Sequence, residues 1–165
     1  MKKWILVITL SLLLLPIAQA AHPHRIGVGA NYWVAVDSIH VDDLNDDGLS
    51  YLLTYQWRPT LVGLQADLEF LPDLFGKDAI APAAYLVVGS AIYAAAGIGI
   101  VHQDGKIADN PFFAFKAGLD LEVLPSIYLD ISACYRFNSK YDFNDAIDAI
   151  DTDTVFLGAA VRLGF

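Results

Sequence analysis

The end of the chain carries the pattern that most restricts its fold. From Thr154 to Phe165, apolar side chains alternate with small or polar ones up to the last residue. One face holds Val155, Leu157, Ala159, Val161, Leu163 and Phe165, and the other holds Phe156, Gly158, Ala160, Arg162 and Gly164. Because successive side chains of a β-strand point to opposite faces, this period of two predicts a strand with one fully apolar face.

The same alternation recurs in several earlier segments. These are residues 25–36, 49–58, 61–71, 112–123 and 127–137. Pro59-Thr60 and Pro125-Ser126 lie between neighbouring segments and predict tight turns. Longer stretches such as Asp37–Gly48 and Ser139–Asp153 are rich in aspartate and predict loops. The chain is therefore predicted to be all-β.

The uncharged stretch Ala79–Val101 allows two interpretations. It is long enough to cross a bilayer as one helix. However, Pro82 lies near its start, Gly89-Ser90 at its middle, and Gly97 and Gly99 near its end, and these are poor helix residues. A helix this apolar would also stop export at the inner membrane. We therefore expect a hairpin of two strands that turns at Gly89-Ser90.

The amino terminus has the layout of an export signal. Lys2 and Lys3 precede an apolar run from Trp4 to Ile17, and small residues at Ala18 and Ala20 follow it. This pattern predicts a signal peptide at residues 1–20 that is cleaved, leaving one domain at residues 21–165. His22 and His24 then fall in an N-terminal tail that we expect to be disordered.

These segments add up to eight strands, each of about the length that spans a bilayer when tilted. The chain has a mean hydropathy of +0.46, and Cys134 is its one cysteine, so no internal disulfide stabilises it. Backbone groups in lipid must all be paired, and separate strands achieve this only by closing into a barrel. The predicted fold is an eight-stranded antiparallel up-and-down transmembrane β-barrel, with short turns at the periplasmic end and longer loops at the other.

Sorting the charges by face predicts a balanced interior. The inward positions carry five cations, Arg25, Arg58, Lys116, Arg136 and Arg162, and five anions, Asp67, Glu69, Asp120, Glu122 and Asp130. A lumen of eight strands is just wide enough to be filled by side chains, so we expect these ten groups to form a structural network of ion pairs. Small residues at Ala81, Ala83, Ala95, Gly97 and Gly99 would leave room for the long cations. The net negative charge is then carried by the loops.

The outward aromatic residues fall at two heights. Tyr55, Trp57 and Phe165 lie at the periplasmic strand ends, and Tyr51, Phe70, Phe113 and Phe137 lie near the loops. This placement is typical of the two aromatic belts at membrane interfaces.

Motifs for chemistry are sparse. Asp43, Asn45, Asp47 and Gly48 match the first half of an EF-hand loop, but Thr54 stands where the bidentate glutamate belongs, so calcium binding stays open and no metal is assigned. His40 and His102 have no nucleophile spaced with them, and Cys134 is expected to be a small packing residue. We assign no catalytic residue and no cofactor.

Taken together, the chain resembles the small Gram-negative outer-membrane barrels of the OmpA and OmpX type. The resemblance covers Arg25 to Phe165 and is carried by Gly97-Ile98-Gly99, Gly118, Tyr135-Arg136-Phe137 and the terminal Val161-Arg162-Leu163-Gly164-Phe165. It implies integral insertion in the outer membrane, contact with outer-membrane lipid and lipopolysaccharide, and recognition of Phe165 by the barrel-assembly machinery. We expect no peptidoglycan-binding domain after the barrel, so the resemblance does not imply tethering to the cell wall.

The resemblance leaves three functions open. The first is a structural or surface-interaction protein, in adhesion or envelope integrity, whose loops meet an extracellular partner; Phe143, Ile147 and Ile150 are apolar points in the longest loop. The second is a narrow, porin-like conduit for ions or small hydrophobic molecules. The third is a lipid-modifying enzyme, but the sequence has no His-x-Ser pair of the kind that lipid A deacylases show. Nucleic acid is not an expected partner.

Overall fold

The computed structural model describes most of the chain after the predicted signal peptide. The described residues are 22–35, 47–74, 77–103, 106–108, 110–137, 140–141, 150–151 and 153–165. The predicted signal peptide, most of the predicted loops, and the calcium-loop residues Asp43 and Asn45 lie outside these ranges.

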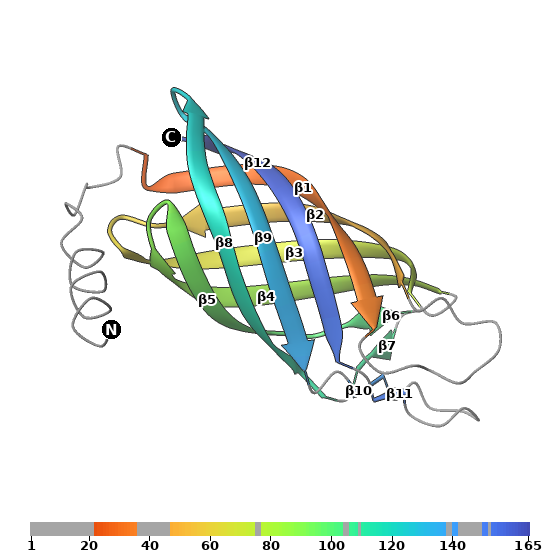
Figure 1. Cartoon of the computed structure of the whole chain (residues 1–165). Coiled ribbons are helices and arrows are strands. Elements are labelled where there is room, and N and C mark those ends of the chain that lie inside the picture. Colours follow the sequence, from red (N-terminus) through yellow and green to blue (C-terminus); the bar gives the residue numbers. More distant parts are fainter. Residues whose placement is uncertain are drawn as a thin grey trace, which may run out of the picture.

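Eight long strands form the body of the molecule (Figure 1). They are β1 His24–Ala35, β2 Asp47–Trp57, β3 Val62–Leu74, β4 Lys77–Gly89, β5 Ile92–Gly99, β8 Phe112–Leu124, β9 Ile127–Phe137 and β12 Thr154–Gly164. Four two-residue strands lie between the long ones: β6 His102–Gln103, β7 Lys106–Ile107, β10 Lys140–Tyr141 and β11 Ile150–Asp151. Within the described residues, no helix is long and apolar enough to cross a membrane.

The sheet closes on itself. Each long strand pairs antiparallel with its neighbour in the chain, and β12 pairs with β1 to complete the ring. Pairing can be followed once around from Trp57 through Leu64, Leu86, Ala96, Phe115, Tyr135, Val155 and Val34. It returns to β2 at Asp47, ten residues from the start. This stagger is the geometric signature of strands tilted to the barrel axis, and the predicted fold class is confirmed.

The stretch that could have been a helix is a hairpin. Residues 79–88 belong to β4, residues 92–99 belong to β5, and the chain turns between them at Gly89-Ser90. Gly89 has a φ of 127°, and an added Cβ would lie 2.3 Å from the Ile92 carbonyl oxygen. Only glycine accepts both constraints readily, so this residue fixes the turn.

Burial alternates along the long strands as the sequence predicted, except at the end of β8. Residues Leu49 to Trp57 show the pattern: Tyr51, Leu53, Tyr55 and Trp57 are exposed, and their neighbours between them are buried. The exposed side chains are almost entirely apolar and belong to the outer wall of the barrel, where lipid would contact them. Most polar side chains face the lumen, together with small and aromatic ones such as Ala81 and Tyr85.

The two ends of the barrel differ. One, called the turn end below, has short connections at residues 58–61, 90–91 and 125–126 and also holds Phe165. At the other, called the loop end, β3 extends to Leu74 and β4 begins at Lys77, so both are longer than the predicted segments that end at Leu71 and begin at Ala79. The β6–β7 pair also lies at the loop end and is bonded to β4.

Candidate functional site

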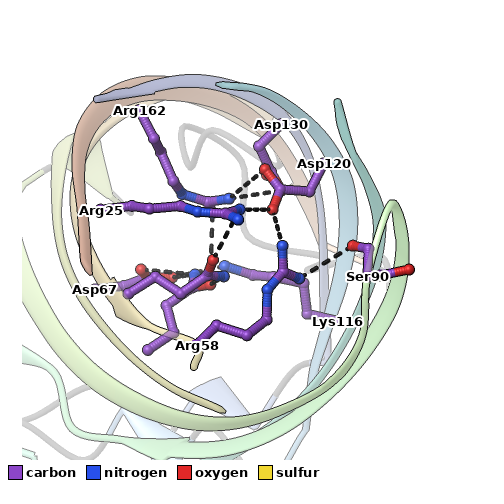
Figure 2. A network of polar contacts seen from close by, with 10 residues as sticks. Arg25, Arg58, Asp67, Ser90, Lys116, Asp120, Asp130 and Arg162 are labelled. Atoms are coloured by element: carbon purple, nitrogen blue, oxygen red, sulfur yellow. Dashed lines mark hydrogen bonds and ion pairs between the residues drawn. The ribbon is translucent and has the colours of Figure 1, made fainter. Parts of the chain in front are cut away.

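Five charged side chains meet inside the barrel at its turn end, and we call them the turn-end cluster (Figure 2). They are Arg25, Arg58, Arg162, Asp120 and Asp130, from β1, the first turn, β12, β8 and β9. The Asp120 carboxylate accepts hydrogen bonds from Arg25 and Arg58 and lies 3.5 Å from Arg162 Nη1. Arg162 Nη1 also donates to Asp130 at 3.0 Å. One carboxylate thus joins three strands and a turn across the lumen.

Arg58 anchors the turn that carries it. Its Nη1 donates to the Ser90 carbonyl oxygen at 3.1 Å, which links the first turn to the second. Burial lowers the pKa of Arg58, and the nearby Arg25 and Arg162 lower it further, whereas the Asp120 charge opposes the shift. Burial is the main cause of this shift, and the two neighbouring arginines add to it.

A second ion pair lies next to this cluster. Lys116 Nζ on β8 donates to Asp67 Oδ2 on β3 at 2.6 Å and lies over the Tyr85 ring. Gln65 bridges the two groups: its amide donates to Asp67 at 2.9 Å, and its oxygen accepts from Arg162 Nη2 at 3.4 Å. Polar contacts are therefore continuous from the turn end to the Lys116–Asp67 pair.

At the loop end, a third ion pair is enclosed by aromatic rings. Arg136 on β9 is paired with Glu69 on β3. Its guanidinium carbon lies 3.9 Å from the centre of the Phe156 ring and 4.7 Å from that of Phe112, both distances typical of cation–π contacts. Asn31 and Ser50 donate further hydrogen bonds to Glu69.

Apolar side chains complete the loop-end filling. Trp33, Leu71, Val101 and Ala108 are buried with the two phenylalanines in one hydrophobic cluster. Val101 and Ala108 come from the segment around β6 and β7 and are joined by a backbone hydrogen bond of 2.8 Å. This segment thus adds apolar packing to the loop end of the barrel.

Nine of the ten predicted lumen charges lie in the interior, and the prediction for Glu122 is wrong. Glu122 is exposed, and its carboxylate accepts a hydrogen bond from the Ser126 backbone N–H at 3.1 Å. The reason is the β8–β9 hairpin, which projects beyond the barrel rim (Figure 1) and shifts register between Glu122 and Leu124. Residues 121–124 are exposed on both faces, so alternation there no longer separates lumen from lipid.

Sequence reasoning missed part of the filling. Tyr85 and Tyr93 on β4 and β5 are buried in the lumen, whereas only small residues of these two strands were predicted to lie there. Their positions match the alternation through Ala83 and Ala95, so the same pattern would have placed them inside. The space expected at Gly97 and Gly99 is occupied by the rings of Tyr85 and Phe112.

The first described residues meet the carboxyl end of the chain at the turn end. Phe165 donates its backbone N–H to the His24 carbonyl oxygen at 2.9 Å, and the two rings stack with centroids 5.8 Å apart. His24 Nδ1 lies 2.7 Å from the Tyr55 hydroxyl, and His22 Nε2 lies 2.9 Å from the Ser126 hydroxyl. The expectation that both histidines belong to a disordered tail is wrong, because β1 begins at His24 and its pairing orders them.

The other candidate residues that the structure describes do not form a catalytic or metal-binding site. Cys134 is buried, 4.0 Å from the Tyr85 hydroxyl, as expected for a packing residue. Among the described residues, no group of three His, Cys, Asp or Glu side chains is placed to hold a metal ion. The half EF-hand falls mostly outside the described residues.

Comparison with known proteins identifies the architecture. No family model and no curated protein matches the chain by sequence. Among solved structures, Neisserial surface protein A matches with a TM-score of 0.64 and 15% identity, over 87% of this chain and 97% of that one. The chain has the fold of the small eight-stranded outer-membrane barrels.

Two further structures have lower scores. A de novo designed transmembrane β-barrel matches with a TM-score of 0.48 and 14% identity, over 85% of this chain and 94% of that one. The N-terminal barrel of Pseudomonas aeruginosa OprF matches with a TM-score of 0.48 and 12% identity, over 84% of this chain and 97% of that one. The match to Neisserial surface protein A confirms the resemblance drawn from the sequence at the level of the fold.

Proposed function

We propose that this protein is a structural or surface-interaction component of the Gram-negative outer membrane. In this role the barrel is a closed scaffold, and its acidic extracellular loops provide the contacts that serve adhesion or envelope integrity. The observation that carries the proposal is the filled lumen: ion pairs occupy its turn end and middle, and Arg136, Phe112 and Phe156 pack across its loop end. A barrel filled along its length favours anchoring over transport.

The outer-membrane location rests on three features. Residues 1–20 have the composition of a signal peptide. The outer wall is apolar along every long strand, with Trp57 and Phe165 exposed at one end and Tyr51 and Phe113 at the other. Outer-membrane lipid and lipopolysaccharide are the partners that such a wall would contact. The barrel-assembly machinery is the proposed partner of the C-terminal strand, through Phe165.

A non-catalytic role fits the chemistry of the interior. The buried carboxylates Asp67, Glu69, Asp120 and Asp130 are all engaged by cations. A general base or nucleophile has to reach its substrate, and these groups are enclosed by the barrel wall instead. We therefore place the function in the loops and the outer surface.

The test compares a deletion strain with strains that carry the wild-type gene or a loop variant. The variant replaces residues 142–149 with a Gly-Ser linker of equal length, and a heat-modifiable gel shift verifies that its barrel is folded. We expect the deletion to reduce either resistance to detergent with chelator or attachment to host cells, and the loop variant to reproduce the loss. Unchanged resistance and attachment in the deletion strain would contradict the proposal.

A further inference from the structure

The turn-end cluster contains more positive than negative charge. Arg25, Arg58 and Arg162 contribute three cations, whereas Asp120 and Asp130 contribute two anions. All five residues are buried. The cluster therefore encloses one formal positive charge without a partner.

The rest of the lumen does not compensate this charge. Lys116 is paired with Asp67, and Arg136 is paired with Glu69, so each of these pairs is neutral. Glu122, which would have completed the balance, lies on the exposed hairpin and is bound to the turn. A solvated carboxylate at the rim is screened and compensates a buried charge only weakly.

Hydrogen bonding in the cluster is unbalanced in the same direction. A guanidinium has several N–H donors and no acceptor. The guanidinium groups of all three arginines donate to the two oxygens of Asp120. Arg162 is fully buried, and its Nε has no acceptor among the residues that the structure describes. The cluster thus lacks both a negative charge and an acceptor. Each deficiency is costly in a buried site.

We propose that the turn end of the lumen binds one small monovalent inorganic anion, chloride under ordinary conditions, held by Arg25, Arg58 and Arg162. A bound halide supplies the missing charge and accepts hydrogen bonds from several directions at once. The exposed fractions of Arg25, Arg58 and Arg162 are 4%, 3% and 0%, which favours a single-atom anion over a phosphate or a carboxylate.

The anion reaches this site from the turn end, where the chain forms a strap across the arginines. The backbone N–H of Arg58 donates to the Pro23 carbonyl oxygen at 2.8 Å. The side-chain Nε of Arg25 donates to the His22 carbonyl oxygen at 3.4 Å. In this proposal, a shift of this short segment releases both contacts and admits the anion at the turn end.

The first experiment uses the wild-type barrel, refolded in detergent micelles. Its thermal unfolding midpoint is measured in sodium chloride and in sodium gluconate at equal ionic strength, because gluconate is too large for the site. A ligand that binds only the folded state raises the midpoint with concentration. We expect chloride to raise it by a few degrees, with saturation; equal midpoints in the two salts overturn the proposal.

The second experiment removes the excess charge. Arg58→Gln leaves two cations and two anions in the cluster, so the variant is expected to lose the chloride-dependent rise. Lys77→Gln removes an exposed cation at the loop end and is expected to keep the rise in full. A rise of equal size in both variants contradicts a site at the arginines. If Arg58→Gln does not fold, the wild-type comparison and the following measurement still decide.

The third experiment locates the ion. Crystals of the wild-type protein grown in sodium bromide are expected to show an anomalous peak within hydrogen-bond distance of Arg162 Nε. A map without such a peak contradicts the proposal. A peak that is accompanied by no chloride effect on the midpoint would mean binding at crystal concentration only, and that outcome also overturns it.

Discussion

At the scale of single residues, the buried arginines of the lumen are stabilised by protein partners, because water cannot reach them to take the place of a lost partner. Arg136 is paired with Glu69 and packed between Phe112 and Phe156. Removing one partner of a buried ion pair leaves the other charge uncompensated, and this costs more than the pair itself contributes. Exposed cations such as Lys77 are screened by water, so their removal changes the stability of the protein only slightly.

Arg136→Ala is therefore expected to lower the free energy of unfolding by about 3–5 kcal/mol, the usual cost of breaking a buried pair. Lys77→Ala, the exposed control, is expected to change it by less than about 1 kcal/mol. Urea titration of the refolded protein in micelles, followed by tryptophan fluorescence, measures both values. Similar losses in the two variants would show that the lumen pairs are not stabilising.

The exposed position of Glu122 leads to a second residue-scale prediction. Glu122→Gln is expected to shift the free energy of unfolding by less than about 0.5 kcal/mol, as for most surface changes. Asp120→Asn is expected to lower it by several times more, because Asp120 joins three arginines. The same urea titration tests both, and a large loss for Glu122→Gln would restore that residue to the lumen network.

Glycines on the lumen face make room for rings. A Cβ at Gly97 would lie 2.3 Å from Tyr85 Cδ1 and 2.6 Å from the Ala84 carbonyl oxygen. Gly97→Ala is therefore expected to destabilise the barrel by about 1–3 kcal/mol, the usual cost of overpacking. Ala96→Val, on the outward face of the same strand, is the control and is expected to be nearly neutral. If the control costs as much as Gly97→Ala, lumen packing is not the cause.

At the scale of elements, β12 is held on both edges and at its end. It pairs with β9 and β1, and Phe165 closes the seam through the stacked His24 ring. The Phe165 ring itself is exposed on the outer wall, where its apolar area contributes little to packing. Its loss should therefore affect assembly more than the finished barrel.

Deleting Phe165 is expected to reduce the amount of folded protein in outer-membrane fractions several-fold. The truncated chain, refolded in vitro, is expected to unfold within a few degrees of wild type. His24→Ala is the control, because it removes the stacking partner and leaves the terminal residue in place. Normal insertion of the truncated chain would contradict a role for Phe165 in assembly.

The sequence predicted each element to the extent that side-chain alternation determined it. Alternation placed six of the eight long strands and located Glu69 and Arg162 inside, because lipid and lumen impose opposite demands on neighbouring side chains. The β4–β5 hairpin followed instead from Pro82 and Gly89-Ser90 in an uncharged stretch. Alternation failed for Glu122, where the strand leaves the barrel and both faces meet water. It also gave no sign of the short β6–β7 pair, since two-residue strands are too short to show a period.

Pairing partners were not predictable from the sequence. The face of Arg162 followed from its neighbours, but its contacts with Asp130, Asp120 and Gln65 depend on how the barrel closes. A strand position says nothing about which of seven other strands supplies the opposite charge. The stagger of the strands around the ring decides this, and it emerges only from the complete set of pairings.

At the scale of the whole molecule, an apolar outer wall encloses an occupied interior. The wall suits lipid, and the interior is crossed by ion pairs near the turn end and by rings near the loop end. The barrel is then a rigid anchor, and specificity belongs to the loops. The alternative, a narrow conduit, needs the same barrel with a continuous water-filled path.

Conductance across planar bilayers separates these two accounts most directly. The sample is the folded barrel, verified by its heat-modifiable migration, and a known open porin at equal protein concentration is the positive control. Because the lumen is filled, the account predicts a current at the level of the bare bilayer across the tested voltages. Stable, stepwise openings that scale with salt concentration would show a continuous water-filled path and contradict the closed-scaffold account.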